Sequence, residues 1–272
     1  MKNNRPGLTR RAVLAGLPAV ASIGLQRQPK PLVIDAHCHA GRGEAMSAPW
    51  TSRADPEITL RHMAEAGIDR TIIFPINNNE YEKPNQEIAE ICRRYPEKFI
   101  GFAKHDPQTE AGRIQSLLRH EVTSLGLKGL KLHRLPTREV LEAVAELGIP
   151  VLYHPEKVAN FHMIAEEYPK INFIMAHLGN FASRDWPEHM EAISVARRYP
   201  NVYLETSSVV FFKYLEMAAK ELGAGKLIFG SDGPELDSRV ELYKIRLLKL
   251  SPADEARVLG GNIIKLLPHG TV

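Results

Sequence analysis

The stretch Leu32-Val33-Ile34-Asp35-Ala36-His37-Cys38-His39-Ala40-Gly41 decides between two folds in which strands alternate with helices. It begins as an apolar, β-branched strand and then runs into two histidines that are two residues apart. An open, doubly wound sheet that binds a nucleotide would carry a glycine-rich G-x-G-x-x-G loop at this turn. The stretch lacks that loop, which favours a closed barrel, where functional side chains gather at the carboxyl ends of the strands.

Seven further short apolar runs follow, and segments with helical spacing separate them. The predicted strands are residues 32–36, 71–75, 99–103, 129–132, 150–153, 171–176, 202–205 and 227–230. The predicted helices include residues 58–66, 86–94, 138–147 and 214–222. This alternation is typical of a parallel sheet. Eight repeats over residues 31–272 predict an α/β fold of one domain, a single (β/α)8 TIM barrel.

The first thirty residues differ from the rest, because no acidic residue occurs before Asp35. Arg10-Arg11 precede an apolar run over residues 12–21, which is the pattern of a secretory signal and resembles the twin-arginine export motif. The run is shorter than the ~20 apolar residues that span a bilayer. We therefore predict that residues 1–30 are an export signal (residues 1–21) and a disordered lead. The mature protein is then periplasmic or extracellular, with no stable membrane anchor.

The positive charge of the chain resides largely in this segment. Removal of residues 1–21 changes the formal net charge from +3 to −1 through the loss of Lys2, Arg5, Arg10 and Arg11. Later in the chain no cluster of Lys and Arg with interleaved aromatic residues occurs, so we expect no nucleic-acid partner. Cys38 and Cys92 provide no disulfide framework, and we expect both to be buried free thiols.

Polar residues gather where the predicted strands end. Counting from the first strand to the eighth, these residues are His37 and His39, His105, Lys131 with His133 and Arg134, His154, His177, Glu205 and Asp232. Because the strands of a barrel end at one mouth, we expect five of these histidines and the aspartate to converge there. Neutral imidazoles and a carboxylate suit zinc and similar divalent ions and leave a position open for water or substrate.

Several of these strand ends resemble the amidohydrolase superfamily, and more narrowly its amidohydrolase-related subgroup of small hydrolases, lactonases and nonoxidative decarboxylases. The resemblance covers residues 31–272 and rests on five motifs: Val33-Ile34-Asp35-Ala36-His37-Cys38-His39, Gly129-Leu130-Lys131-Leu132-His133, Ala176-His177-Leu178-Gly179, Phe229-Gly230-Ser231-Asp232-Gly233-Pro234 and Gly261-Asn262-Ile263-Ile264-Lys265-Leu266-Leu267.

The resemblance implies a TIM barrel that binds one divalent metal, zinc or, as the alternative, manganese. It implies that the ligands are His37, His39, His154 and Asp232. Asp232 would also accept a proton from the attacking water, and His177 would orient or polarise the substrate or contact the water.

Four further residues keep two interpretations each. Lys131 is either a charge on the substrate side or, as in binuclear relatives, a carboxylated bridge between two metals. His133 and Arg134 either bind a substrate carboxylate or lie on the surface beside the mouth. Glu205 either hydrogen-bonds a ligand histidine or is an inward acid with another partner.

We predict a metal-dependent hydrolase that uses activated water on a small ester, lactone or amide. The first alternative is a metal-dependent nonoxidative decarboxylase of an aromatic or unsaturated acid, and the second is a noncatalytic metal-binding barrel. The partner is a small molecule, and relatives often form homodimers. Residues 41–52 and 75–81 are predicted to form the wall of the pocket.

Overall fold

The computed structural model describes residues 1–2, 30–44 and 53–272, and Pro31–Val272 form one compact unit. The predicted export signal lies outside the described residues apart from Met1 and Lys2. Most of the predicted pocket loop, residues 41–52, also lies outside them. Within the described ranges, no helix is long and apolar enough to cross a membrane.

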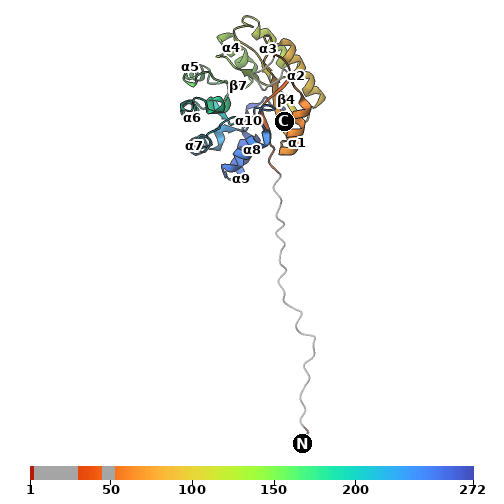
Figure 1. Cartoon of the computed structure of the whole chain (residues 1–272), viewed down its shortest axis with the longest axis vertical. Coiled ribbons are helices and arrows are strands. Elements are labelled where there is room, and N and C mark those ends of the chain that lie inside the picture. The colour runs from red at the N-terminus through yellow and green to blue at the C-terminus, as the bar shows by residue number, and fades with distance from the viewer. Residues whose placement is uncertain (3–29, 45–52) are drawn as a thin grey trace. The chain divides into compact units, whose positions relative to one another are not determined.

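Eight strand–helix units follow one another along the described chain, and the helices lie outside the strands (Figure 1). The strands are β1 (Ile34–Arg42), β3 (Arg70–Pro75), β4 (Phe99–Gly101) with β5 (Ala103–Lys104), β6 (Leu130–Leu132), β7 (Val151–Tyr153), β8 (Phe173–Met175), β9 (Val202–Glu205) and β10 (Leu227–Ile228). The helices that follow them, in the same order, are α1 (Pro56–Ala66), α2 (Glu82–Arg94), α3 (Ile114–Thr123), α4 (Arg138–Leu147), α5 (His162–Glu167), α6 (Pro187–Arg198), α7 (Lys213–Leu222) and α8 (Ser238–Leu247). The described chain also contains β2 (Arg53–Ala54), which pairs with β1 antiparallel, and the short α-helices α9 (Pro252–Ala256) and α10 (Asn262–Leu266).

Hydrogen-bonded ladders join the strands in two sheets, ordered β2-β1-β3-β4 and β10-β9-β8-β7-β6-β5. At one seam the chain itself continues from β4 to β5 through Phe102, whose backbone N–H donates to Ile73 O at 2.9 Å. At the other seam the N–H of Ala36 in β1 donates to Phe229 O at 3.0 Å, directly after β10. With β4 and β5 counted as one strand, eight parallel strands therefore enclose a common interior, which confirms the predicted (β/α)8 barrel.

Alternate residues of the strands divide the apolar core into two layers. Residues that face the helices form the larger cluster, as Leu130 and Leu132 do in β6. Cys38, which is buried, belongs to this layer, whereas Cys92 of α2 is only half-buried. The interior cluster extends from α10, at the end where the strands begin, to Phe74 near the end of β3. It includes Ile34, Ile72, Phe74, Ile100, Leu152, Ile174, Ile228, Ile263 and Leu266.

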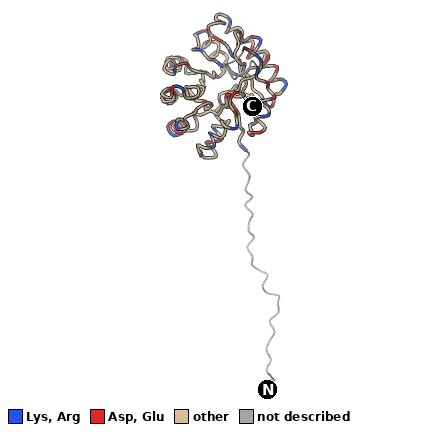
Figure 2. Tube along the Cα trace, in the orientation of Figure 1, with Lys and Arg blue, Asp and Glu red and all other residues tan. Residues whose placement is uncertain are grey.

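Apolar side chains thus fill the end of the barrel where the strands begin. Charged residues lie mostly in the outer helices and loops (Figure 2). Buried polar residues such as His37, Lys131 and Glu205 lie toward the carboxyl ends of the strands, which is the end that carries chemistry in such barrels.

A β-bulge in β1 turns two histidines toward the interior. The pairing of β1 with β3 shifts register between Asp35 and Cys38, so the alternation of side chains changes there. Before the bulge Ala36 belongs to the interior cluster. After it His37 and His39, both buried, occupy the interior side, while Cys38 packs toward the helices.

The predicted first strand, residues 32–36, is too short. β1 continues to Arg42, so its two histidines lie within the strand and not beyond its end. Pairing with β3 and burial inside the barrel hold these polar residues extended, and an apolar run alone gives no sign of that.

Candidate metal centre

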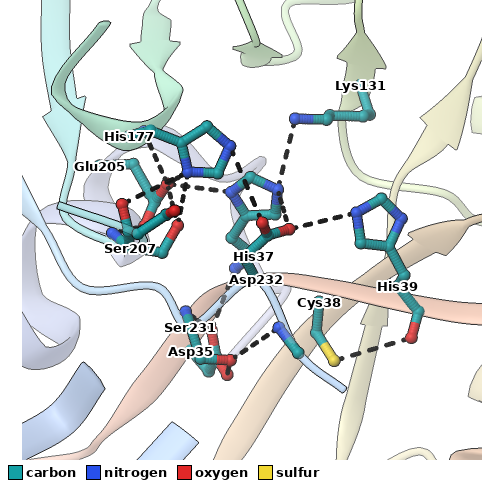
Figure 3. A network of polar contacts seen from close by, with 12 residues as sticks. Asp35, His37, Cys38, His39, Lys131, His177, Glu205, Ser207, Ser231 and Asp232 are labelled. Atoms are coloured by element: carbon teal, nitrogen blue, oxygen red, sulfur yellow. Dashed lines mark hydrogen bonds and ion pairs between the residues drawn. The ribbon is translucent and has the colours of Figure 1, made fainter. Parts of the chain in front are cut away.

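Three buried side chains, from β1 and from the turn after β10, converge on one point (Figure 3). His37 Nε2 lies 3.1 Å from Asp232 Oδ1, and His39 Nε2 lies 3.2 Å from the same oxygen. Each of the three residues offers a ligand atom within 4.8 Å of the other two. The structure therefore brings together three of the four residues predicted to hold a metal.

The hydrogen-bond partners of His37 indicate that this cluster suits a cation. His37 Nδ1 lies 2.9 Å from Glu205 Oε2, and because a carboxylate only accepts hydrogen bonds, Nδ1 carries the proton. In the neutral ring, Nε2 then carries a lone pair and no proton. This lone pair faces the lone pairs of Asp232 Oδ1, and the two atoms repel each other. A divalent cation bound by both atoms removes this repulsion, and zinc and manganese both accept imidazole with carboxylate. Without a cation, burial and Lys131 lower the pKa of His37, but Asp232 and Glu205 outweigh them and raise it.

Four other imidazoles at this end of the barrel, those of His39, His133, His154 and His177, are neutral at pH 7, as metal binding requires. Burial lowers the pKa of His39 to about 4. Burial, with a smaller effect of Lys131, lowers the pKa of His154 to about 3. Burial also holds the pKa values of His133 and His177 well below their ordinary range. These side chains can therefore donate lone pairs without first losing a proton.

Five histidines form a closed series of ring contacts. The ring centroids are 5.9 Å apart for His37 and His39, 6.4 Å for His39 and His133, and 5.3 Å for His133 and His154. The series closes with 4.7 Å between His154 and His177 and 4.9 Å between His177 and His37. Among the described residues, two groups of three satisfy the 4.8 Å separation, one of His37, His39 and Asp232 and one of His37, His177 and Glu205, and His154 belongs to neither. His154, which directly follows β7, contacts them through the ring of His177.

Asp232 and His177 share an unusual backbone conformation. Both have a φ of 57°, in the left-handed region that costs a non-glycine residue about 1–3 kcal/mol and tends to occur at functional sites. Ser207 fixes the tautomer of His177, because its hydroxyl donates to Glu205 Oε2 at 2.9 Å and its oxygen therefore accepts from His177 Nδ1 at 2.9 Å. The unprotonated Nε2 of His177 then faces Asp232 Oδ2 at 3.9 Å.

Asp232 is ionised at neutral pH. In the absence of a cation, burial alone would raise its pKa, but the protonated form of His37 and hydrogen bonds from His37 and His39 outweigh burial and hold the pKa well below its usual range. An ionised carboxylate at this position can hold a cation and can also accept a proton.

Glu205, at the end of β9, lies behind His37 and is fully buried. Its Oε2 accepts hydrogen bonds from His37 Nδ1, Ser207 Oγ and the His177 backbone N–H at 2.9, 2.9 and 3.2 Å. Gly230 leaves room for it, since a Cβ there would lie 2.5 Å from Glu205 Oε1. The interpretation in which Glu205 hydrogen-bonds a ligand histidine therefore matches the geometry, and such a partner fixes the orientation of the ligand.

The predicted site residues of the fourth strand separate in space. Lys131 of β6 is buried, with Nζ 3.4 Å from His37 Nε2, and burial lowers its pKa to about 8. His133 is half-buried at the mouth. Arg134 is exposed at the rim, where its Nε donates to Asp106 Oδ2 at 2.9 Å.

Three further side chains at this end of the barrel were not predicted from the sequence. Phe74 packs against the two histidines of β1, with ring centroids 5.3 and 4.7 Å away. Ser207 sets the tautomer described above. Lys104 of β5 is buried and pairs in register with Lys131 of β6. The signal for Lys104 was its place at the end of a predicted strand, directly before His105.

Comparisons with known proteins agree with this architecture. A model of the amidohydrolase family matches residues 34–269, and no curated protein matches the sequence. An amidohydrolase from Burkholderia multivorans with bound zinc superposes with a TM-score of 0.72 at 16% identity, over 87% of this chain and 100% of its own. The 5-carboxyvanillate decarboxylase of Sphingomonas paucimobilis gives 0.69 at 16% identity, over 87% and 98%. A dihydroxybenzoic acid decarboxylase from Polaromonas with bound manganese and 2-nitroresorcinol gives 0.67 at 18% identity, over 87% and 96%. At these identities the likeness shows the shared barrel.

Proposed function

The chain belongs to the amidohydrolase family of metal-dependent enzymes, and from this premise we propose that it hydrolyses a small ester, lactone or amide with metal-activated water. The observation that carries the proposal is the position of Asp232. One of its oxygens meets the two histidines of β1, and the other faces His177 Nε2 at 3.9 Å. The carboxylate of Asp232 thus lies between the histidine pair that can bind a cation, His37 and His39, and the neutral imidazole of His177.

In this proposal His37, His39, Asp232 and His154 hold one divalent ion, with zinc and manganese as the candidates. When bound, such an ion lowers the pKa of a coordinated water to about 7 and polarises a carbonyl. Glu205 keeps the proton of His37 on Nδ1 and so keeps Nε2 free to act as a ligand.

The residues of the chain then divide the proton transfers between them. Asp232, ionised at neutral pH, accepts a proton from the attacking water as the new acyl–oxygen bond forms. His177 presents an unprotonated Nε2, which orients that water by accepting a hydrogen bond from its second hydrogen, which stays on the oxygen. The proton held by Asp232 passes to the leaving oxygen or nitrogen as the acyl bond breaks.

The test uses the full-length protein loaded with zinc or manganese. Elemental analysis gives the metal content, and panels of lactones, esters, amides and aromatic acids are assayed for acid release and for carbon dioxide. Release of an acid that carries ¹⁸O from labelled water supports hydrolysis. Carbon dioxide from an aromatic acid would replace the proposal by decarboxylation, and bound metal without any turnover would leave a noncatalytic barrel. Two equivalents of metal would instead make Lys131 a bridging residue.

Two variants test the assignment of roles. His37→Ala should lose bound metal and activity together, while circular dichroism remains that of a folded barrel. Asp232→Asn should reduce turnover by about 10²–10⁴-fold, the range of general-base catalysis, and reduce metal content much less. Equal losses of metal and activity in Asp232→Asn would show that Asp232 is a ligand only.

We also propose that residues 1–21 direct export of the enzyme. The support is the sequence alone, since residues 3–29 lie outside the described residues. Cell fractionation should find the protein outside the cytoplasm, with its N-terminus at residue 22. Replacing both Arg10 and Arg11 by lysine should retain it in the cytoplasm, and unchanged export of that variant would contradict a twin-arginine signal.

A further inference from the structure

The loop that carries His177, residues 176–183, has an unusual backbone conformation at several positions. Four of its non-glycine residues have a positive φ and form two adjacent pairs, His177 at 57° with Leu178 at 48°, and Ala182 at 53° with Ser183 at 50°. Each such residue costs free energy, and the conformation persists only where the surrounding structure holds it in place. The groups that hold this loop therefore also set the direction in which His177 points.

One side chain outside the loop, His189 of α6, bonds to a residue of each pair. Its Nδ1 lies 2.9 Å from Leu178 O, and its Nε2 lies 2.8 Å from Ser183 Oγ. His189 is fully buried, and its ring packs against Tyr214 of α7 with the ring centroids 4.9 Å apart. Burial lowers the pKa of His189, so the imidazole is neutral at pH 7. The ring thus has a fixed place from which it holds both pairs.

The hydrogen bonds of His189 have one direction. Leu178 O can only accept, so His189 Nδ1 carries the proton, and its Nε2 then accepts from the hydroxyl of Ser183. The oxygen of Ser183 accepts in turn from the backbone N–H of Val210 at 3.1 Å. A chain of hydrogen bonds therefore runs from the loop after β9 through Ser183 and His189 to the carbonyl next to His177.

The loop after β9 also carries Ser207, the hydrogen-bond partner of the His177 ring. Ser207 Oγ lies 2.9 Å from His177 Nδ1. The next residue, Ser208, accepts from the backbone N–H of Ala182 at 3.0 Å with its hydroxyl oxygen. These bonds join the two loops near His177, and the chain through His189 fixes both loops to α6.

We propose that His189 is a positioning residue for the proposed reaction, because it holds the loop of residues 176–183 so that His177 Nε2 faces Asp232 and the attacking water. In this role His189 acts through the carbonyl of Leu178 and the hydroxyl of Ser183 and takes no part in the proton transfers. The inference rests on the role of His177 in the proposed function, but the ordering of the His177 ring can be measured without any turnover.

The test compares variants of the zinc-loaded, full-length protein with the wild type. His189→Leu removes both ring bonds and keeps the position apolar. His189→Asn keeps an N–H donor near the position of Nδ1, so the bond to Leu178 O can form again. The matched control is His162→Leu, because His162 of α5 also bonds through both ring nitrogens, at 2.8 Å from Glu191 Oε1 and 3.3 Å from the Tyr199 hydroxyl.

NMR of protein with ¹⁵N-labelled histidine detects the proton on His177 Nδ1, and its absence from His177→Gln assigns the resonance. In His189→Leu this resonance should broaden or disappear. The kcat on a substrate from the panel should fall about 10–100-fold, since a displacement of about 1 Å can cost about 10²-fold, while KM and zinc content change little. His189→Asn should retain the resonance and most of kcat, and His162→Leu should match the wild type.

A folded His189→Leu, judged by circular dichroism, that keeps the wild-type His177 resonance or the wild-type kcat would overturn the proposal, because a merely structural role would lower only the stability to urea. Equal losses of zinc and kcat would overturn it too, as would a His189→Asn no better than His189→Leu. If His189→Leu does not fold, Ser183→Ala breaks the same chain, and an unchanged His177 resonance there would overturn the proposal. Absence of turnover on every substrate would concern the proposed function, whereas the resonance still tests the role of His189.

Discussion

Replacing Glu205 by glutamine tests whether the buried carboxylate behind His37 supports metal binding. The side chain keeps its size, but it exchanges one acceptor oxygen for an NH2 donor. In the wild-type protein, four hydrogen bonds converge on the two oxygens of Glu205, and protein groups donate all of them. Whichever way the amide turns, its NH2 group faces a donor.

The magnitude follows from these contacts. A buried donor left without an acceptor costs about 1–3 kcal/mol, so the free energy of unfolding should fall by about that amount. Loss of the partner behind a ligand histidine typically weakens metal binding by about 10–100-fold, which is about 1.4–2.7 kcal/mol. His37 would also lose the group that fixes its proton on Nδ1.

The assay is a competition titration with a zinc chelator, together with urea unfolding of the metal-free protein. The control is Glu121→Gln, because Glu121 is also buried and also bonds a histidine, with Oε2 2.8 Å from His105 Nε2. Glu121→Gln should lower stability and leave zinc affinity unchanged. Wild-type zinc affinity in Glu205→Gln, or an equal loss in the control, would refute the reasoning.

Three further outcomes are expected. Gly230→Ala should lower zinc affinity and should lower the free energy of unfolding by about 1–3 kcal/mol, because the new Cβ would lie 2.5 Å from Glu205 Oε1. Unchanged zinc affinity would contradict this prediction. Asn201→Ala should cost about 1–3 kcal/mol in urea unfolding, because the two hydrogens of the Asn201 NH2 group are shared among three backbone carbonyl oxygens within 3.2 Å, and a loss below 1 kcal/mol would count against it. The contribution of His105 to stability should also fall by about 3 kcal/mol between pH 6.5 and 9. Burial lowers the pKa of His105, but hydrogen bonds to two glutamates outweigh burial and raise it to about 9, so the stabilising charge is complete below pH 6.5 and disappears as pH rises through 9. An NMR titration of His105 that gave a pKa near 6.5 would refute this.

The order of strands and helices could be predicted because each strand of the barrel is a short apolar run between amphipathic segments. The exact bounds of the strands could not be predicted. β1 continues through His37 and His39 because backbone pairing and burial hold them there, and neither is visible in a pattern of hydrophobicity. The bulge that turns both rings inward depends on the pairing with β3, which a single sequence does not reveal.

The site was predicted as a set of residue types and not as a geometry. The resemblance of strand-end motifs placed His37, His39 and Asp232 in one cluster, and the structure brings them together. Lys104 was not predicted, because a lysine at a strand end usually lies in solvent. Only the burial of β5, in register with Lys131, distinguishes it from a surface lysine.

The closing seam of the barrel has a consequence for the way the protein is made. Asp35 and Ser231, which hydrogen-bond across this seam, are 196 residues apart, and the metal cluster spans the same gap. Bringing such distant segments together costs on the order of 5 kcal/mol of loop entropy. During synthesis, the metal site therefore cannot form until β10 and Asp232, which follows it, have left the ribosome. Metal binding then stabilises the closed barrel, because the ligands come from both sides of the seam. The amide hydrogens of β1 at the seam should therefore exchange with solvent faster when the ion is removed.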